Sequence, residues 1–286
     1  MPDVEYYICD ISVVSFICSA ANSDYHHVMF TARLTARFTA RLTARLTALA
    51  ALSVFTLGAP ACAPAPTVAA TPAAPAVSRD LRWARVAAEH RAIYIETYRA
   101  AAERLRTLAA GRAPDSWGVI LDADETVLDN SEYQIGRIPF DGSFDAATWA
   151  TWVAKGKAPA LPGAVAFTGL VHQLGGKVVI VTNRDDSQCP ITRSNLAQVA
   201  IRADLVLCKA GTNDKNPRFD AVERGSAEPG FPAVDVLEWV GDNIEDFPHL
   251  SQAIRNQPDS AFSAFGSTFF ALPNAMYGSW QANPFR

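Results

Sequence analysis

Four short apolar runs organise the chain beyond residue 111. They cover residues 118–122, 177–182, 205–208 and 236–240, and each ends in polar residues. Helix-like segments at 163–174 and 190–203 lie between them. Continuous apolar strands that alternate with helices are typical of a parallel sheet covered on both faces. The pattern therefore predicts an α/β fold with helices on both faces of a parallel sheet.

A long amphipathic segment precedes these runs. Apolar side chains recur at steps of three and four residues from Arg79 to Gly111, which predicts one long helix with a single apolar stripe. Gly111 supplies a stop signal. Because helical spacing alone explains His90, we interpret it as a core residue and not as a catalytic one. The stripe consists of Trp83, Val86, His90, Tyr94, Tyr98, Ala101, Leu105 and Leu108.

The front of the chain has the features of an export signal. Residues 31–46 carry four regularly spaced arginines, and an apolar stretch at 46–58 and the triplet 59–61 follow. A membrane helix needs about 20 apolar residues, so this stretch is too short to span a bilayer. We interpret residues 1–61 as an N-terminal extension and signal peptide, with an arginine-lined helix of the fold as the alternative. Residues 1–28 carry no positively charged residue, so we hypothesise that translation begins at Met29.

Cys62 opens a tether rich in alanine and proline, residues 62–78, which cannot build a core. A cysteine followed by such a spacer resembles the start of a bacterial lipoprotein, although Ala59 stands where leucine is usual. Ordinary cleavage after Ala61 with release of the protein stays open. We expect an exported protein of the periplasm or outer membrane, whose membrane contact is through lipid on Cys62. The tether leads to one domain, residues 79–286.

The composition narrows the possible partners. The 286 residues are 49% hydrophobic, which is ample for a core. With 25 basic and 29 acidic residues the net charge is -4, so the chain lacks the electrostatic footprint of nucleic-acid binding. A substrate that carries phosphate would need a locally positive site or a metal ion, because the overall charge does not attract it.

Polar clusters follow all four predicted strands, at residues 122–129, 182–186, 209–215 and 241–246. In parallel sheets the ligand site lies beyond the carboxyl ends of the strands. Asp122, Asp124 and Thr126 form the motif D-x-D-x-T. A calcium loop would need glycine at Val127 and glutamate at Tyr133, so that interpretation fails. A solvated acidic turn would explain one cluster but not four at the same edge.

The ordered motifs resemble those of a known family. D-x-D-x-T, V-T-N-R at 181–184, a lysine and G-D-N-x-x-D-F at 241–247 are similar to the four signatures of haloacid dehalogenase (HAD) phosphatases. The stretches LDADETVLDNSEYQ, FDAATWATWV, PGAV and LPNAMYGSW resemble the class C non-specific acid phosphatases, the lipoprotein 5'-nucleotidase family of bacterial envelopes. The similarity runs from about Arg79 to Trp280, and Ala123 departs from the larger aliphatic residue usual there. It implies a HAD-like Rossmannoid sheet with a small helical cap, about residues 130–165, inserted after the first strand.

The resemblance implies a phosphomonoesterase that depends on Mg²⁺ and acts on nucleoside 5'-monophosphates and other phosphomonoesters. Asp122 would be the nucleophile that forms an aspartyl-phosphate. Asp124 would protonate the leaving oxygen and later deprotonate water. The Mg²⁺ ligands would be Asp122, the main-chain carbonyl of Asp124, and Asp242, because this ion prefers oxygen ligands. Asp246 would support the water shell of the metal or Lys215.

The phosphate-binding residues follow from the same resemblance. The Thr182 hydroxyl and the amide of Asn183 would bind the phosphoryl oxygens, and a lysine would supply positive charge. Lys209 follows the third strand directly, whereas Lys215 precedes the letters NPRF and so fits the family's lysine-x-x-arginine context. We choose Lys215, with Lys209 as the alternative.

Aromatic residues suggest how a nucleobase would bind. In the family the residues that match Trp149 and Tyr277 flank the base, and stacking on flat rings tolerates any base. Trp152 and Trp280 are open between substrate binding and packing, because such rings dominate protein cores.

Cys189 and Cys208 are predicted to form a disulfide. Cys189 would open the helix after the second strand and Cys208 would end the third strand, so both lie at the same sheet edge.

Two other functions stay open at this point. The same site could transfer phosphate between alcohols, and an envelope lipoprotein could keep the fold as a binding module without catalysis.

Overall fold

The computed structural model describes residues 76–140 and 142–285. The predicted export signal, Cys62 and residues 63–75 of the tether lie outside the described residues. Within the described ranges, no helix combines the length and the apolar character needed to cross a bilayer.

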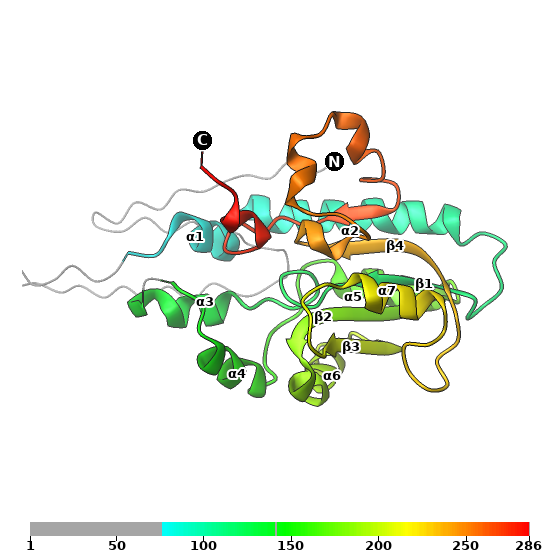
Figure 1. Cartoon of the computed structure of the whole chain (residues 1–286), viewed down its shortest axis with the longest axis horizontal. Coiled ribbons are helices and arrows are strands. Elements are labelled where there is room, and N and C mark those ends of the chain that lie inside the picture. Colours follow the sequence, from blue (N-terminus) through cyan, green and yellow to red (C-terminus); the bar gives the residue numbers. More distant parts are fainter. Residues whose placement is uncertain (1–75, 141, 286) are drawn as a thin grey trace, which may run out of the picture. The chain divides into compact units, whose positions relative to one another are not determined.

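A five-stranded parallel sheet forms the centre of the fold, with strand order β3-β2-β1-β4-β5 (Figure 1). The first four strands match the four predicted apolar runs. The fifth strand was missed, because three residues at a sheet edge are too few for a periodic signal. The strands are β1 (Trp117–Leu121), β2 (Lys177–Asp185), β3 (Leu205–Lys209), β4 (Asp235–Gly241) and β5 (Phe269–Ala271).

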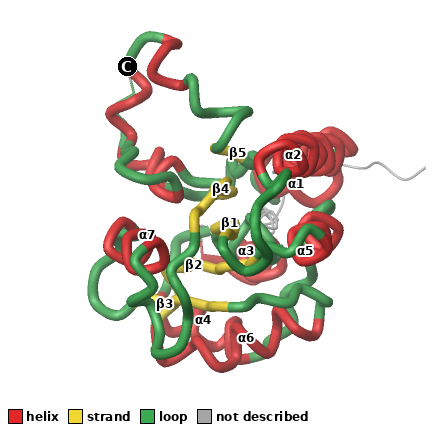
Figure 2. The backbone as a smooth tube through the Cα atoms, turned by 90° about the vertical axis from the view of Figure 1, so that its right-hand side faces the viewer, coloured by secondary structure: helices red, strands yellow, loops and turns green. Residues whose placement is uncertain are grey.

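Helices cover both faces of the sheet, as Figure 2 shows. α2 (Ala88–Leu108), α5 (Ala164–Gln173) and α6 (Cys189–Gln198) pack on one face, in a core that includes Trp117 and Phe167. α7 (Asn216–Glu223) packs on the other face, in a second core that includes Ile120 and Phe219. The predicted α/β architecture is confirmed.

The prediction of one helix from Arg79 to Gly111 is wrong. α1 (Arg79–Val86) ends before Ala87, whose backbone is extended, and α2 ends at Leu108. Leu81 is buried whereas Val86 is 72% exposed, so Val86 is not part of the apolar stripe. Arg85, at the end of α1, donates a hydrogen bond to Ser131 Oγ at 3.1 Å. Alanine is a good helix former, so the sequence carries no signal for the break.

His90 packs among aromatic rings, but at the rim of the core. It is half-buried, with its ring 5.2 Å from Trp83 and 4.6 Å from Tyr94 between centroids. Burial lowers the pKa of His90, and Asp129 opposes this effect. The interpretation as a packing residue agrees with these contacts, although the ring is only partly buried.

A small helical insertion separates β1 from α5. It contains α3 (Ser131–Arg137), the 3-10 turn η1 (Ile138–Phe140) and α4 (Ala146–Ala154). Asp145 caps α4 by accepting the amide of Thr148 at 2.8 Å. The insertion lies where a cap was predicted, and its helices end at Ala154. Five further 3-10 turns are η2 (Asp186–Gln188), η3 (Ile244–Asp246), η4 (Gln252–Asn256), η5 (Asp259–Phe262) and η6 (Ser279–Ala282).

The predicted disulfide joins Cys189 at the start of α6 to Cys208 in β3, with 5.8 Å between the Cα atoms. Both cysteines are 7% exposed. The bond ties the first turn of α6 to the third strand, beside the edge of the sheet where β2 ends.

Reduction of this disulfide is expected to lower the free energy of unfolding by about 3 kcal/mol, because the bond closes a loop over a sequence separation of 19 residues. Urea unfolding with and without dithiothreitol measures the difference. The double variant Cys189→Ser, Cys208→Ser is the control and should not respond to dithiothreitol. Two alkylatable thiols in the native protein would contradict the prediction.

Candidate active site

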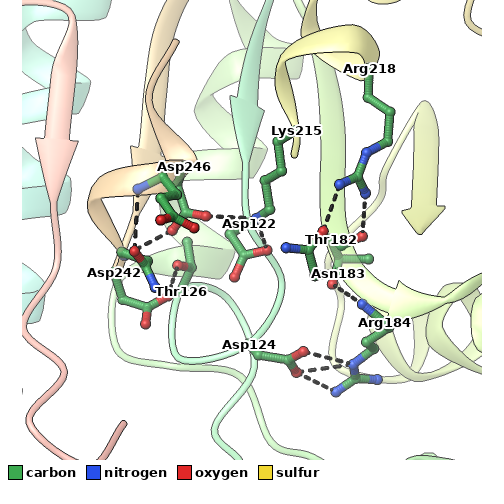
Figure 3. Close-up of polar contacts among 12 residues, drawn as sticks. Asp122, Asp124, Thr126, Thr182, Asn183, Arg184, Lys215, Arg218, Asp242 and Asp246 are labelled. Carbon is green, nitrogen blue, oxygen red and sulfur yellow. Dashed lines mark hydrogen bonds and ion pairs between the residues drawn. The ribbon is translucent and has the colours of Figure 1, made fainter. Parts of the chain in front are cut away.

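Charged and polar side chains from three neighbouring strands meet at one edge of the sheet (Figure 3). Asp122 follows β1 directly, Thr182 lies near the end of β2, and Asp242 follows β4. Lys215 stands immediately before α7. Since β1 lies between β2 and β4, their carboxyl ends bring these residues together, at the edge that the sequence predicted.

Lys215 lies between two carboxylates. Its Nζ donates to Asp122 Oδ1 at 2.5 Å and to Asp246 Oδ1 at 2.7 Å, and the residue is only 5% exposed. Burial lowers the pKa of Lys215, but Asp122 and Asp246 outweigh this effect and raise it, so the side chain stays an ammonium. Lys209 is the last residue of β3, and it stands opposite Asp185 of β2 in the register of the sheet. Of the two lysines, the structure therefore brings Lys215 to Asp122.

Asp122, Asp242 and Asp246 form a cluster whose carboxylate oxygens lie within 4.8 Å of one another. Burial is the largest cause that raises the pKa of Asp122 to about 7, although Lys215 lowers it. Burial also raises the pKa of Asp242 well above its ordinary value, and Asp246 and Asp122 add to this. With all three carboxyls ionised, the single ammonium of Lys215 leaves the cluster with excess negative charge, and the cluster offers only oxygen ligands. The cluster therefore fits a hard divalent cation such as Mg²⁺.

The cluster differs in one residue from the predicted ligand set. Both oxygens of Asp246 have other partners, because Oδ1 accepts from Lys215 and Oδ2 accepts the amide of Asn243 at 2.9 Å. Gly241 makes room for this carboxylate, since a Cβ there would lie 2.3 Å from Asp246 Cβ. The geometry suits the supporting position beside Lys215 that the sequence suggested for Asp246.

Two residues to which the sequence assigned no role orient Asp242. Thr126 Oγ1 donates to Asp242 Oδ1 at 3.0 Å, and Asn274 Nδ2 donates to Oδ2 at 2.9 Å. Both lie inside motifs recognised in the sequence, D-x-D-x-T and LPNAMYGSW. Membership of these motifs was the only feature of the sequence that pointed to a role for the two residues. Hydrogen bonds of this kind fix the direction in which a carboxylate presents its free lone pairs to a metal.

The loop after β1 is anchored from α2. The hydroxyl of Tyr94 donates to the carbonyl of Glu125 at 2.5 Å, and that of Tyr98 donates to the carbonyl of Thr126 at 2.9 Å. Glu125 has a φ of 51°, which is unfavourable for a residue with a side chain. The two tyrosines, which the sequence identified only as members of an apolar stripe, therefore hold the turn that carries the acids.

The side of the site formed by β2 is held by Arg218. Its Nη1 donates to the carbonyl of Thr182 and its Nη2 to Asn183 Oδ1, both at 2.6 Å. Thr182 is fully buried, and its hydroxyl accepts the amide of Arg184 at 3.2 Å. The sequence analysis gave Arg218 no role, although the lysine-x-x-arginine context pointed to it. Lys215 and Arg218 thus bring two cations to one end of α7.

Asp124 is directed to a different neighbour from Asp122. Figure 3 shows its carboxylate facing Arg184, whereas the carboxylate of Asp122 faces Lys215. Arg184 Nη2 donates to Asp124 Oδ1 at 2.7 Å, and Asn130 Nδ2 donates to the same atom at 2.8 Å. The two acids of D-x-D-x-T are therefore separately neutralised, which lets them lie two residues apart.

The aromatic residues singled out in the sequence have different environments. Trp149 is half-buried, and its ring contacts are with Tyr133 and Phe144. The Trp152 side chain is 8% exposed and donates from Nε1 to Asn130 Oδ1 at 2.8 Å, so it has a packing role. Trp280 is 41% exposed and donates to the carbonyl of Tyr277 at 3.2 Å.

The described part of the chain contains no ring contact between Trp149 and Tyr277. Tyr277 instead lies beside Asn274, whose Oδ1 accepts its amide at 3.4 Å. Its buried hydroxyl lacks a hydrogen-bond partner among the described residues. Tyr277 is thus connected through Asn274 to Asp242, whereas Trp149 belongs to the helical insertion.

The comparisons with known proteins agree with this geometry. The family described as HAD superfamily, subfamily IIIB (Acid phosphatase) matches residues 44–280. A class C acid phosphatase from Bacillus anthracis is similar in structure, with a TM-score of 0.62, 30% sequence identity and coverage of 71% of this chain and 85% of that chain. A second structure of that enzyme, with tungstate bound, matches at the same TM-score and coverage with 29% identity.

A curated plant protein is also similar. Acid phosphatase 1 of Solanum lycopersicum is 30% identical over 167 residues, which are 57% of this chain and 58% of the relative. The chain thus spans somewhat more than half the length of this relative.

Proposed function

The chain belongs to the acid phosphatases of subfamily IIIB in the HAD superfamily, and from this membership we propose that it is a phosphomonoesterase that depends on Mg²⁺. The contact between Asp122 and Lys215, beside the cluster of Asp122, Asp242 and Asp246, carries the proposal. A buried carboxylate lies there next to an ammonium and a candidate cation site, and attack on a phosphate dianion requires a nucleophile and positive charge of this kind.

Each residue contributes to one of two half-reactions. In the first, Asp122 Oδ forms a bond to phosphorus while the bond to the leaving oxygen breaks, and Asp124 gives that oxygen a proton. In the second, Asp124 takes a proton from water as the water oxygen bonds to phosphorus and Asp122 is released. Lys215 and Thr182 bind phosphoryl oxygens and orient them. Asp122, Asp242 and the main-chain carbonyl of Asp124 would hold a Mg²⁺ ion, which would further neutralise the phosphoryl charge when bound.

Nucleoside 5'-monophosphates are the proposed substrates among phosphomonoesters. Support comes from Trp149 in the helical insertion and Tyr277 beside Asn274, which offer aromatic faces on separate elements. The tungstate in the Bacillus anthracis structure is a tetrahedral oxyanion like phosphate, which supports an oxyanion site in the shared fold. We further propose that the protein works in the cell envelope, on the basis of the signal-like residues 31–61 and Cys62.

Removal of divalent metal is expected to abolish phosphate release, with a loss of at least about 10²-fold, because the carboxylate cluster then repels the phosphate dianion. The measurement compares phosphate release from nucleoside monophosphates and simple alkyl phosphates, with EDTA and after addition of Mg²⁺. Magnesium should restore activity, and isothermal titration should show Mg²⁺ binding that Asp242→Asn weakens. Full activity in EDTA would refute the metal role, and a folded protein without turnover on any substrate would refute the enzyme.

A further inference from the structure

A buried arginine fixes the carboxylate of Asp124. Arg184 donates to Oδ1 from Nη2 at 2.7 Å and from Nε at 3.0 Å, and its Nε also lies 3.2 Å from Oδ2. Asn130 adds its hydrogen bond to Oδ1. The Arg184 side chain is 1% exposed, whereas that of Asp124 is 16% exposed. The planar guanidinium sets the orientation of the carboxylate, and Oδ2, with a single longer contact, is the oxygen left to carry the proton.

Arg184 is itself held from several directions. Its Nη1 donates to Thr192 Oγ1 on α6 at 3.3 Å, and its Nη2 also donates to Asn130 Oδ1 at 3.2 Å. Its backbone amide bonds the hydroxyl of Thr182. The arginine therefore has little freedom to move, and it ties Asp124 to the strand that carries Thr182.

The helical insertion completes this support. The guanidinium of Arg184 lies 5.7 Å from the ring centroid of Trp149, a cation–π distance. One turn along α4, Trp152 donates to Asn130, the second residue that binds Asp124. Two tryptophans of one helix thus contact the two residues that hold the acid.

We propose that Arg184 is a positioning residue for the general acid Asp124, and that α4 stabilises this arrangement through Trp149 and Trp152. Protonation of the leaving oxygen then depends on the helical insertion as well as on Asp124. The inference rests on the proposed function, because it takes Asp124 as the proton donor. In the step concerned, the proton passes from Asp124 to the leaving oxygen as the bond from phosphorus breaks, and Arg184 keeps all its protons.

Two substrates separate positioning from a general structural role. 4-Nitrophenolate leaves without protonation, whereas an alkoxide needs a proton, and kcat/KM reports the steps up to cleavage of the ester bond. Arg184→Met is expected to lower kcat/KM for an alkyl phosphate by about 10²-fold or more, and for 4-nitrophenyl phosphate by less than about 10-fold. Arg184→Lys keeps the positive charge but not the planar fork, so it should recover part of the loss.

Three further variants sharpen the test. Asp124→Asn should show the same selective loss, and the double variant Asp124→Asn, Arg184→Met should be no slower on the alkyl phosphate than Asp124→Asn alone, because Arg184 acts through Asp124. Trp152→Phe keeps an aromatic ring but removes the donor to Asn130, so it should lower the alkyl-to-nitrophenyl ratio several-fold. Arg193→Met, a half-exposed arginine of α6, is the matched control and should leave the ratio unchanged.

Equal losses on both substrates, or losses that multiply in the double variant, would overturn the positioning role. An unchanged ratio in Trp152→Phe would overturn the contribution of α4. If Arg184→Met does not fold, as judged by circular dichroism, Arg184→Lys and Trp152→Phe decide the question by the same ratio. Hydrolysis that persists in Asp122→Asn would instead refute the proposed function, so the two failures are distinguishable.

Discussion

Asp122→Asn is expected to lower kcat by at least about 10⁴-fold on every phosphomonoester, because the amide cannot attack phosphorus and removing a nucleophile costs this much or more. The substitution changes one atom and keeps an oxygen that can accept from Lys215, so the fold should persist. In the native protein burial raises the pKa of this carboxyl to about 7, and Lys215 opposes the effect. Lys215 therefore favours the charged form that makes Asp122 a nucleophile.

The measurement is phosphate release under saturating substrate, with thermal unfolding as the check on folding. Asp220→Asn is a matched control, since Asp220 lies on α7 and pairs with Arg224 at the surface. The control should keep full activity. Retention of more than about one hundredth of the activity in Asp122→Asn would exclude Asp122 as the nucleophile.

Glu238→Gln is expected to raise the free energy of unfolding at pH 7 by on the order of 2 to 3 kcal/mol. Glu238 lies in β4 with a fully buried side chain, and neither carboxylate oxygen has a hydrogen-bond partner among the described residues. Burial raises the pKa of Glu238 from 4.5 to about 9, and Arg104 opposes this only in part. The folded protein therefore holds a proton that the unfolded chain releases.

The difference in pKa between the folded and unfolded states determines how the free energy of unfolding changes with pH. Below about pH 4.5 both states are protonated and the glutamate costs nothing through ionisation. As the pH rises toward 9 the unfolded state alone loses the proton, so the native protein becomes progressively less stable. Urea unfolding from pH 4 to pH 8 should show Glu238→Gln and the native protein converging at pH 4 and separating at pH 8. As a control, Glu223→Gln, at an exposed position on α7, should follow the curve of the native protein. A difference in the free energy of unfolding between Glu238→Gln and the native protein that stays constant with pH would contradict the ionisation argument.

The sequence was sufficient to predict the α/β fold, because four short continuous apolar runs alternate with helix-like segments, as buried parallel strands do. It also predicted the sheet edge with Asp122, Thr182, Lys215 and Asp242, since these residues stand directly after strands or in ordered motifs. The disulfide between Cys189 and Cys208 was predictable because a helix start and a strand end were expected at the same edge of the sheet.

The remaining features depend on contacts that do not produce a periodic pattern in the sequence. The break at Ala87 is a one-residue change of backbone in a sequence that favours helix throughout. The hydrogen bonds from Tyr94 and Tyr98 to the loop after β1 come from residues whose spacing only indicated burial. Arg184 and Arg218 lay inside recognised motifs, but their partners could be assigned only from side-chain positions.

The strand order β3-β2-β1-β4-β5 has a consequence for how the chain acquires its site. β4 is inserted beside β1 although β2 and β3 intervene in the sequence, and the hydrogen bond from Thr126 to Asp242 spans 116 residues. Such distant pairings slow folding, because long loops must close before the contacts form. The acids around Asp122 come together only when β4 joins the sheet. The unfolded chain therefore has no assembled site for a divalent cation. Magnesium that binds the native cluster would therefore act as a folding ligand, and its concentration would set how much of the protein survives unfolding stress.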